Sequence, residues 1–307
     1  MPAPLVSVVV PTFNRPVLLL ETLRSILAQT YRELDVIVVD NHSSYDVAAA
    51  VASLGDPRVR LLQIHNEGFI GASRNLGIAQ ARGSLVAFCD DDDLWEPDKT
   101  RAQLEAYDSP RHAAVATSAL YVGDVRWYPR QSTFSRAEAR FDDLLMQGTP
   151  VLSSLLLPKE DARFAVVGAF QHVEDFDLLL RVTAGGKTVR VLRAPLVRCR
   201  VHSANESLDR SKIYNALNVL EAHRKTMSTD SYRKGLGRLY DIFGIIALRA
   251  GAPAGPFFLK SLRSRFSLRT LGAWVVANLP AKVRSWLLST YYVLRNANDV
   301  YPKAGEF

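Results

Sequence analysis

The sequence predicts an α/β fold, in which helices flank a mostly parallel sheet and a helical region follows at the C-terminus. In the first half, short runs of β-branched residues alternate with segments whose leucines recur at helical spacing. Strand, helix and strand in this order are typical of a parallel sheet that is covered on both faces. From residue 209 onward the pattern is helical, so we predict two regions, 1–207 and 208–307.

Each predicted element follows from a local pattern. Valine occupies four of the five positions at 6–10, which indicates a buried strand, and Pro16 then suits the first turn of a helix. By the same criteria we predict strands at 36–39, 59–64, 85–89, 113–121, 151–157, 188–192 and 196–201, the last two separated by Pro195, and helices at 47–54, 72–81, after Pro97 to 107, and 174–184. The stretch 121–150 shows no clear period.

Composition excludes several classes of protein. Of the 307 residues, 48% are hydrophobic and 22% are charged, as in globular proteins and unlike disordered or fibrous chains. Two cysteines, Cys89 and Cys199, give no disulfide framework, and the first residues lack the basic and long apolar regions of a secretory signal. We therefore expect a cytoplasmic protein.

Charge is distributed unevenly along the chain. Residues 1–189 carry 18 Lys and Arg against 24 Asp and Glu, whereas residues 190–307 carry 20 against 7. The net charge of +7 therefore combines an acidic first part with a strongly basic tail. The two parts are expected to meet different partners.

Four consecutive carboxylates, from Asp90 to Asp93, follow directly on the apolar run 85–89. Carboxylates this close repel one another, so a folded chain keeps them in water or around a cation. Hard oxygen ligands on a short loop suit Mg²⁺ or Mn²⁺, and both ions commonly partner diphosphates. A solvated acidic turn is the alternative interpretation.

Two further loops are expected beside the acidic run. Pro11-Thr12 and Asp40-Asn41 also follow predicted strands. Because ligands of parallel sheets bind beyond the carboxyl ends of the strands, all three loops should converge on one crevice.

Five segments of the chain closely resemble the family 2 glycosyltransferases with the GT-A fold. They occur in consistent order, at 6–15, 25–31, 38–41, 72–77 and 88–95. The resemblance covers roughly residues 5–205, far more than one short motif provides. It implies a GT-A, nucleotide-diphospho-sugar transferase fold and an enzyme that moves a sugar from a nucleotide donor to an acceptor hydroxyl.

In that family the acidic run binds the nucleotide sugar and its metal. Asp90 and Asp92 match the Asp-x-Asp spacing, and the resemblance implies Asp92 as the metal ligand, with Asp91 as the second choice. Asp90 and Asp91 are assigned to the nucleotide sugar. A divalent cation would neutralise the charge that grows on the leaving diphosphate. Asp93 is expected to cap the following helix or to face water.

The pair Glu174-Asp175 precedes an apolar helix and resembles the family's Glu-Asp motif, in which the aspartate is the general base. An inverting transfer needs one carboxylate to take the proton of the acceptor hydroxyl as its oxygen attacks the anomeric carbon. Asp175 is therefore the predicted base. The alternative is that these acids only place negative charge at a helix N-terminus.

His202 lies in the segment 198–207, which resembles the family's closing Arg-x-His motif. The resemblance implies that a neutral imidazole completes the metal shell or hydrogen-bonds the diphosphate, and that Arg198 or Arg200 offsets phosphate charge. A lone histidine is more often a satisfied surface or core group. The other five histidines show no metal-ligand spacing.

The nucleotide is expected to lie across Pro11, Thr12, Asp40, Asn41 and Arg74. Arg74 opens a predicted helix after two glycines, a setting that suits an anion or a ribose edge. Many family members carry a second acid where this chain has Asn41, and that acid contacts a uracil ring. Since an amide can still pair with a pyrimidine, a UDP-sugar is the expected donor and a dTDP-sugar the alternative.

The basic tail leaves three interpretations open. Residues 242–298 contain eight Lys and Arg and no acid, together with apolar segments too short to span a bilayer. Trp, Tyr and Leu mixed with positive charge fit the interface of an anionic membrane. Packing of the apolar faces on the rest of the protein fits equally well. Nucleic acid ranks last, because no recognised binding motif is present.

Together these patterns predict a metal-dependent, inverting glycosyltransferase with a glycan or lipid-linked acceptor, used in bacterial cell-surface polysaccharide or glycolipid synthesis. It would act in the cytoplasm or at the inner face of the cell membrane. A nucleotidyltransferase is one alternative, but it would need a Gly-rich phosphate loop with a lysine, and Pro11-Thr12-Phe13-Asn14 is not one. A membrane-bound protein with a degenerate sugar-nucleotide site is the other.

Overall fold

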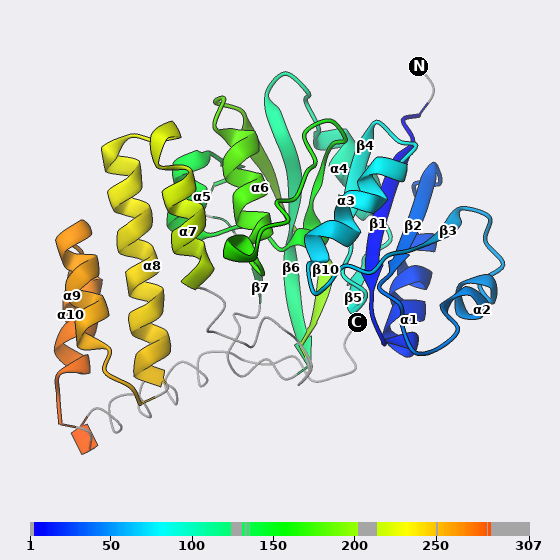
Figure 1. The fold of residues 1–307 in the computed structure, drawn as a ribbon. Helices are drawn as coiled ribbons and strands as arrows, with labels where there is room; N and C mark the ends of the chain where they lie inside the picture. The colour runs from blue at the N-terminus through cyan, green and yellow to red at the C-terminus, as the bar shows by residue number, and fades with distance from the viewer. Residues whose placement is uncertain are drawn as a thin grey trace, which may run out of the picture. The chain divides into compact units, whose positions relative to one another are not determined.

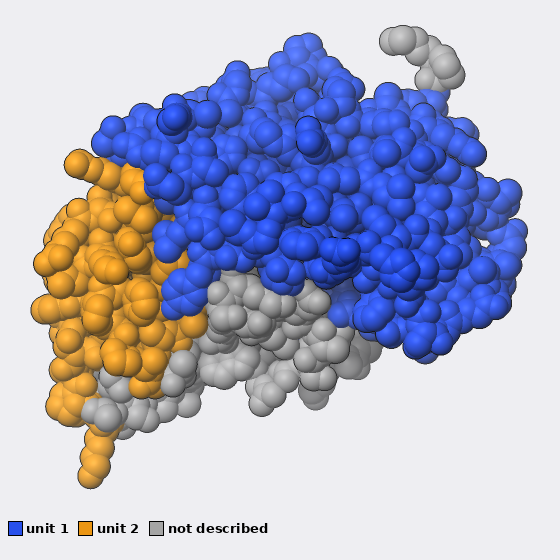
Figure 2. Space-filling view, in the orientation of Figure 1, with its two compact units in different colours: residues 1–231 blue, residues 232–307 orange. Residues whose placement is uncertain are grey.

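The computed structural model describes residues 3–123, 131–132, 134, 136–201, 214–249, 251–280 and 282–283. The chain divides into two compact units, Met1–Ser231 and Tyr232–Phe307 (Figure 2). The predicted boundary at residue 207 lies outside the described residues and stays a prediction.

The first unit is built around one mixed sheet of ten strands within the described residues. Eight strands pair in the order β3-β2-β1-β4-β9-β6-β10-β5, and β7 pairs with β6 and β8 with β10. Their bounds are β1 Val6–Thr12, β2 Leu34–Asp40, β3 Val59–Gln63, β4 Leu85–Phe88, β5 Asp93–Trp95, β6 His112–Gly123, β7 Gln131–Ser132, β8 Glu138–Ala139, β9 Leu156–Pro158 and β10 Thr188–Val201.

The longest pairings are parallel, as the α/β prediction requires. They join β1 to β2, β2 to β3, β1 to β4 and β6 to β10. The short β9 lies between β4 and β6 and runs antiparallel to both. The predicted fold class, a sheet flanked by helices with a helical region after it, is confirmed (Figure 1).

Up to β4 the helices of the first unit alternate with the strands. They are α1 Pro16–Leu27, α2 Val47–Ala52, α3 Ile70–Gln80, α4 Lys99–Ala106, α5 Phe141–Gln147, α6 Glu174–Thr183 and α7 Asn215–Ala222. Every residue of β1 and β2 is buried, and the valines on one face of these strands share a core with Leu19, Leu23 and Ile26 of α1. The valine runs form strands because both of their faces are covered.

Some elements differ from the prediction. The predicted strand 151–157 is a 3₁₀ turn, Leu152–Ser154, followed by β9, and α5 and β5 were not predicted. The two strands predicted around Pro195 are one strand, β10, whose register on β6 shifts on either side of this proline. A proline has no backbone N–H to donate, and a local irregularity lets the strand continue past it.

The second unit holds most of α8 (Thr229–Arg249) and all of α9 (Gly255–Ser264) and α10 (Leu268–Ala277). Its core gathers small residues around Phe258, whose ring lies so close to Gly244 that a Cβ there would be 2.6 Å from it. Within the ranges that the structure describes, none of the helices combines the length and the apolar character that a membrane span needs.

Candidate active site

A cavity of about 800 Å³ opens beyond the carboxyl ends of β1 and β4. Loops that follow β1, β2, β3 and β4 line it, together with the first turn of α6 and the last residues of β10. The predicted site residues on its wall are Pro11, Thr12, Asn41, Arg74, Asp90, Asp91, Asp92 and Asp175. His202 lies outside the described residues. The three loops that were expected to converge therefore line one cavity.

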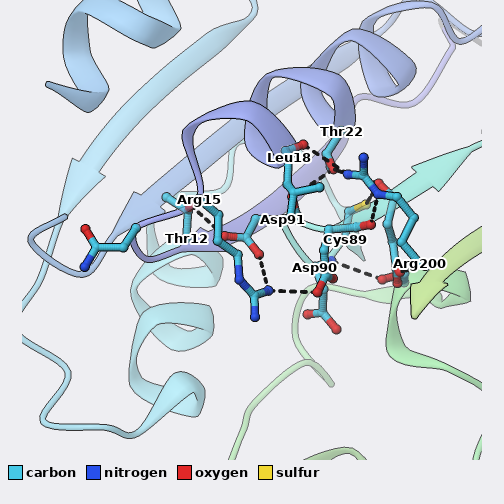
Figure 3. A network of polar contacts seen from close by, with 12 residues as sticks. Thr12, Arg15, Leu18, Thr22, Cys89, Asp90, Asp91 and Arg200 are labelled. Atoms are coloured by element: carbon cyan, nitrogen blue, oxygen red, sulfur yellow. Dashed lines mark hydrogen bonds and ion pairs between the residues drawn. The ribbon is translucent and has the colours of Figure 1, made fainter. Parts of the chain in front are cut away.

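The acidic loop is held by Arg15, a residue to which the sequence analysis gave no role. Its Nη1 donates to Asp91 Oδ1 at 2.9 Å and to Asp92 Oδ2 at 2.8 Å (Figure 3). The second oxygen of Asp91 accepts from the Thr12 hydroxyl at 2.7 Å. Burial raises the pKa of Asp91 to about 6, against the opposing effect of the Arg15 charge. Arg15 thus neutralises two carboxylates that are almost out of water.

Asp90 is the member of the run that is most open to the cavity. Its side chain is 38% exposed, and its Oδ1 accepts from Arg74 Nη2 at 2.9 Å. Arg74 itself is buried, with its guanidinium 5.3 Å from the ring centroid of Phe164. The Arg74 Nε–H is also buried and has no hydrogen-bond partner within the described residues. A buried cation with a spare donor on a cavity wall suits an anionic ligand.

Asp93 neither caps a helix nor faces water, so this prediction was wrong. Asp93 is buried in β5, where its Oδ1 accepts from the backbone nitrogen of Arg200 at 3.3 Å and its Oδ2 lies 3.6 Å from Cys199 Sγ. Burial raises the pKa of Asp93 well above its ordinary range. Asp93 is buried because β5 pairs antiparallel with β10, and this pairing turns the Asp93 side chain inward. Asp98 stands instead at the start of α4.

Arg200 joins the acidic loop to α1. Its guanidinium donates to the Glu21 carboxylate, to Thr22 Oγ1 at 3.1 Å and to the backbone of the acidic loop (Figure 3). The Thr22 hydroxyl lies 3.0 Å from the carbonyl oxygen of Asp91 and 2.8 Å from that of Asp93. These contacts fix the loop backbone, and Arg200 also lines the cavity. Arg198 pairs with Glu96.

Asp175 reaches the cavity from the first turn of α6. Its Oδ2 accepts from the Thr149 hydroxyl and its Oδ1 from the backbone nitrogen of Phe176, both at 2.9 Å. Burial raises the pKa of Asp175, and the Thr149 hydrogen bond opposes that rise. Burial also raises the pKa of the neighbouring Glu174. An oriented carboxylate with a raised pKa on a cavity wall suits proton abstraction.

Asp40 holds the loop after β2 through hydrogen bonds to Ser43. This buried carboxylate accepts from Ser43, through its backbone nitrogen at 3.0 Å and its hydroxyl at 2.6 Å, and it is not on the cavity wall. Asn41 does line the cavity, and its Oδ1 accepts from the backbone nitrogen of Asn66 at 2.8 Å. Because the Asn41 side-chain oxygen is used in this bond, its amide nitrogen is the group that it can offer to a ligand in the cavity.

Backbone strain gathers around the same cavity. Among the described residues, the non-glycine positions with positive φ are Asn14 at 55°, His42 at 54°, Glu67 at 51° and His172 at 68°. The first three lie in the loops after β1, β2 and β3, and His172 lies just before α6. Strained backbone of this kind is concentrated at ligand sites, where the surrounding structure holds it.

Residues 7–156 match the family model for Glycosyl transferase family 2. Over 94 residues the chain is 44% identical to the GalNAc(5)-diNAcBac-PP-undecaprenol beta-1,3-glucosyltransferase of Campylobacter jejuni, which covers 29% of this chain and 30% of that protein. Other alignments cover 17% of two Rickettsia glycosyltransferases and 30% of a Rhizobium meliloti succinoglycan biosynthesis protein. The chain therefore spans less than a third of the length of these relatives.

Two solved structures resemble the whole fold. S. aureus TarS 1–349 in complex with UDP-GlcNAc has a TM-score of 0.62 at 18% identity, covering 89% of this chain and 79% of that one. The mannosyltransferase PcManGT from Pyrobaculum calidifontis, in complex with GDP-Man and Mn²⁺, has a TM-score of 0.60 at 19% identity, covering 96% and 86%. At these identities the likeness shows the fold, which is the predicted GT-A architecture.

Proposed function

We propose that the chain is a member of glycosyl transferase family 2, whose model it matches over residues 7–156, and that it is a metal-dependent, inverting glycosyltransferase that uses a nucleotide-diphosphate sugar. The observation that carries this proposal is the cavity wall shared by the acidic loop, Arg74 and Asp175. The volume of about 800 Å³ is in the range of sites for ligands of this size.

The acidic loop fits a hard divalent cation. Asp90 and Asp92 offer carboxylate oxygens on the cavity wall, the donors that Mn²⁺ and Mg²⁺ prefer, although no three His, Cys, Asp or Glu side chains in the described ranges form a ready metal group. We assign the ion to Asp92, with Asp91 as the second choice and His202 as a further ligand, and we assign Asp90 and Asp91 to the nucleotide sugar. When bound, the ion would offset the charge that develops on the leaving diphosphate. PcManGT, a protein of similar fold, is solved in complex with Mn²⁺, which supports the use of a divalent ion.

The nucleotide would lie along Pro11, Thr12 and Asn41, with its diphosphate toward Arg74. Support comes from the Nε–H of Arg74, which has no partner among the described residues, and from the amide of Asn41, which lines the same cavity. Asp40 would act by holding the loop that carries Asn41. We propose a UDP-sugar as the donor, with a dTDP-sugar as the alternative.

Asp175 would act as the general base. Its carboxylate takes the proton of the acceptor hydroxyl while that oxygen bonds to the anomeric carbon, and the bond to the diphosphate breaks with its electron pair leaving on the diphosphate. Thr149 and the backbone nitrogen of Phe176 hold the carboxylate in one orientation. Attack from the face opposite the diphosphate inverts the configuration of the sugar.

The acceptor would be a glycan or a lipid-linked glycan, in the synthesis of cell-surface polysaccharide or glycolipid at the cytoplasmic face of the membrane. The name of the Campylobacter jejuni relative includes a polyprenyl diphosphate carrier, which supports this class of acceptor. The basic composition of residues 190–307 is consistent with such a location.

A donor screen tests the proposal. The purified chain is incubated with Mn²⁺ and a panel of nucleotide sugars, and release of the nucleoside diphosphate is measured. We expect release from one donor class, lost in Asp92→Ala and kept in the matched control Asp98→Ala, an acid outside the cavity. Donor binding without release on any donor or acceptor would favour a degenerate site, and pyrophosphate release from a nucleoside triphosphate would favour a nucleotidyltransferase.

A further inference from the structure

The second unit exposes two large apolar side chains where α9 ends and α10 begins. Phe266 is 69% exposed and Leu268 is 78% exposed, although the unit has an apolar core of its own. Arg263, Arg265 and Arg269 are exposed on either side of them in the sequence. We call these five residues the basic turn.

Hydrogen bonds give the basic turn a fixed shape. The backbone nitrogen of Arg265 donates to the carbonyl oxygen of Ser261 at 2.7 Å, which closes the end of α9. Ser267 caps α10 by accepting from the backbone nitrogen of Thr270, and the Thr270 hydroxyl donates to Asp241 of α8 at 3.0 Å. The Thr270 side chain is buried, whereas Phe266 and Leu268, on either side of Ser267, are exposed. Their exposure is therefore built into an ordered turn.

The sequence on either side of this turn carries charge of one sign, although Asp241 of α8 meets the turn at Thr270. Residues 251–283 contain five Lys and Arg and no Asp or Glu. A bilayer interface complements both features, because the acyl boundary takes apolar side chains while anionic headgroups attract arginines. In water, two exposed large apolar side chains gain no free energy of burial.

We propose that the basic turn docks the second unit on an anionic lipid surface. Phe266 and Leu268 enter the headgroup and acyl boundary, and Arg263, Arg265 and Arg269 pair with lipid phosphates. This inference names the contact for the membrane location in the proposed function, and it rests on the geometry of the turn rather than on sugar transfer.

Vesicle flotation with the full chain tests the apolar contact. Vesicles of phosphatidylcholine with phosphatidylglycerol should bind the protein, and Phe266→Ser with Leu268→Ser should lower the affinity about tenfold or more, because two buried apolar side chains are lost. The matched control is Val166→Ser with Val167→Ser, which removes two exposed apolar side chains (46% and 52%) of the first unit and should leave the affinity unchanged. Circular dichroism of each variant checks that it is folded.

The charge contact has its own arm. Arg265→Gln and Arg269→Gln should each lower the affinity for anionic vesicles about fivefold, whereas Arg101→Gln on α4 should not. Added salt should weaken binding in the same way. Equal binding to neutral and anionic vesicles, or no binding by the full chain, would overturn the proposal. Self-association that disappears in the Phe266 and Leu268 double variant would also overturn it, since a second copy would then be the occupant.

The two proposals can fail separately. Nucleoside diphosphate release in the absence of vesicles should be the same in the wild type and in the Phe266 and Leu268 double variant. If the chain binds anionic vesicles but releases no nucleotide from any donor, the proposed function fails and the docking surface stands. If the chain releases nucleotide but does not bind vesicles, the proposed function stands and the docking surface fails.

Discussion

Replacing Arg15 with glutamine should destabilise the metal-free protein by about 2–4 kcal/mol at neutral pH. The side chain of Arg15 is 24% exposed, and those of Asp91 and Asp92 are 7% and 9% exposed. Removing one partner from a buried ion pair leaves an uncompensated charge and costs about 3–5 kcal/mol, and the partial exposure of Arg15 lowers this figure. The acidic loop should therefore depend on this one guanidinium more than on any surface ion pair.

Urea denaturation in the presence of EDTA measures this effect. Arg15→Lys keeps the charge and should lose less stability than Arg15→Gln. Arg101→Gln is the matched control, because Arg101 pairs with two acids on the surface of α4 and the loss should stay under about 1 kcal/mol.

The difference between wild type and Arg15→Gln should also depend on pH. Below about pH 6 Asp91 carries a proton in both folded proteins, so its charge no longer needs Arg15 and the difference should shrink. Equal stability of Arg15→Gln and the wild type in EDTA at neutral pH would refute the reasoning.

Three further predictions concern the base, a buried lysine and a close helix contact. Asp175→Asn should stop sugar transfer and leave donor binding, measured by calorimetry, intact; sugar transfer by this variant at the native rate would contradict the assignment. Because burial raises the pKa of Asp175, the wild-type rate should fall on the acid side at a higher pH than it would with an ordinary aspartate. Burial lowers the pKa of Lys99 to about 7. Between pH 7 and pH 10.5 the unfolded chain therefore holds a proton that the folded chain has lost, and the free energy of unfolding should rise with pH. Urea denaturation across this pH range should show no such rise in Lys99→Met, and a rise as steep as that of the wild type would contradict the prediction. Gly77→Ala should cost about 1–3 kcal/mol, because the new Cβ would lie 2.4 Å from Val9 Cγ1; Val9→Ala should recover part of that loss, and strictly additive losses in the double variant would argue against the clash.

The parts of the fold that follow from local pattern were predictable. A valine run buried on both faces reads as β1, and the acidic run after β4 lies at the carboxyl edge, where the parallel strands end. The short β9 was not predictable in its true form, because three residues are too few to show a period and their pairing comes from β4 and β6.

The supports of the site depend on contacts between distant parts of the chain. Arg15 lies 76 residues before Asp91, and Arg200 lies 178 residues after Thr22, so no local spacing connects them. The inward orientation of Asp93 likewise follows from the pairing of β5 with β10. Sequence patterns therefore pointed to the acidic loop and to Thr12, Arg74 and Arg200 as ligand-binding residues, but they gave no role to Arg15 or Thr22 and did not show that these groups hold the loop.

The acidic loop is clamped from both ends of the first unit, and this has a consequence for the order of folding. Contacts between residues so far apart in the chain form slowly, because a large loop must close before they gain any energy. Of the residues that hold the loop, Arg200 is synthesised last, so until β10 pairs with β6 the loop backbone lacks its hydrogen bond from Arg200. A fragment ending at residue 156, where the family match stops, would contain every aspartate of the run together with Arg15 and Thr22, but it would lack Arg200.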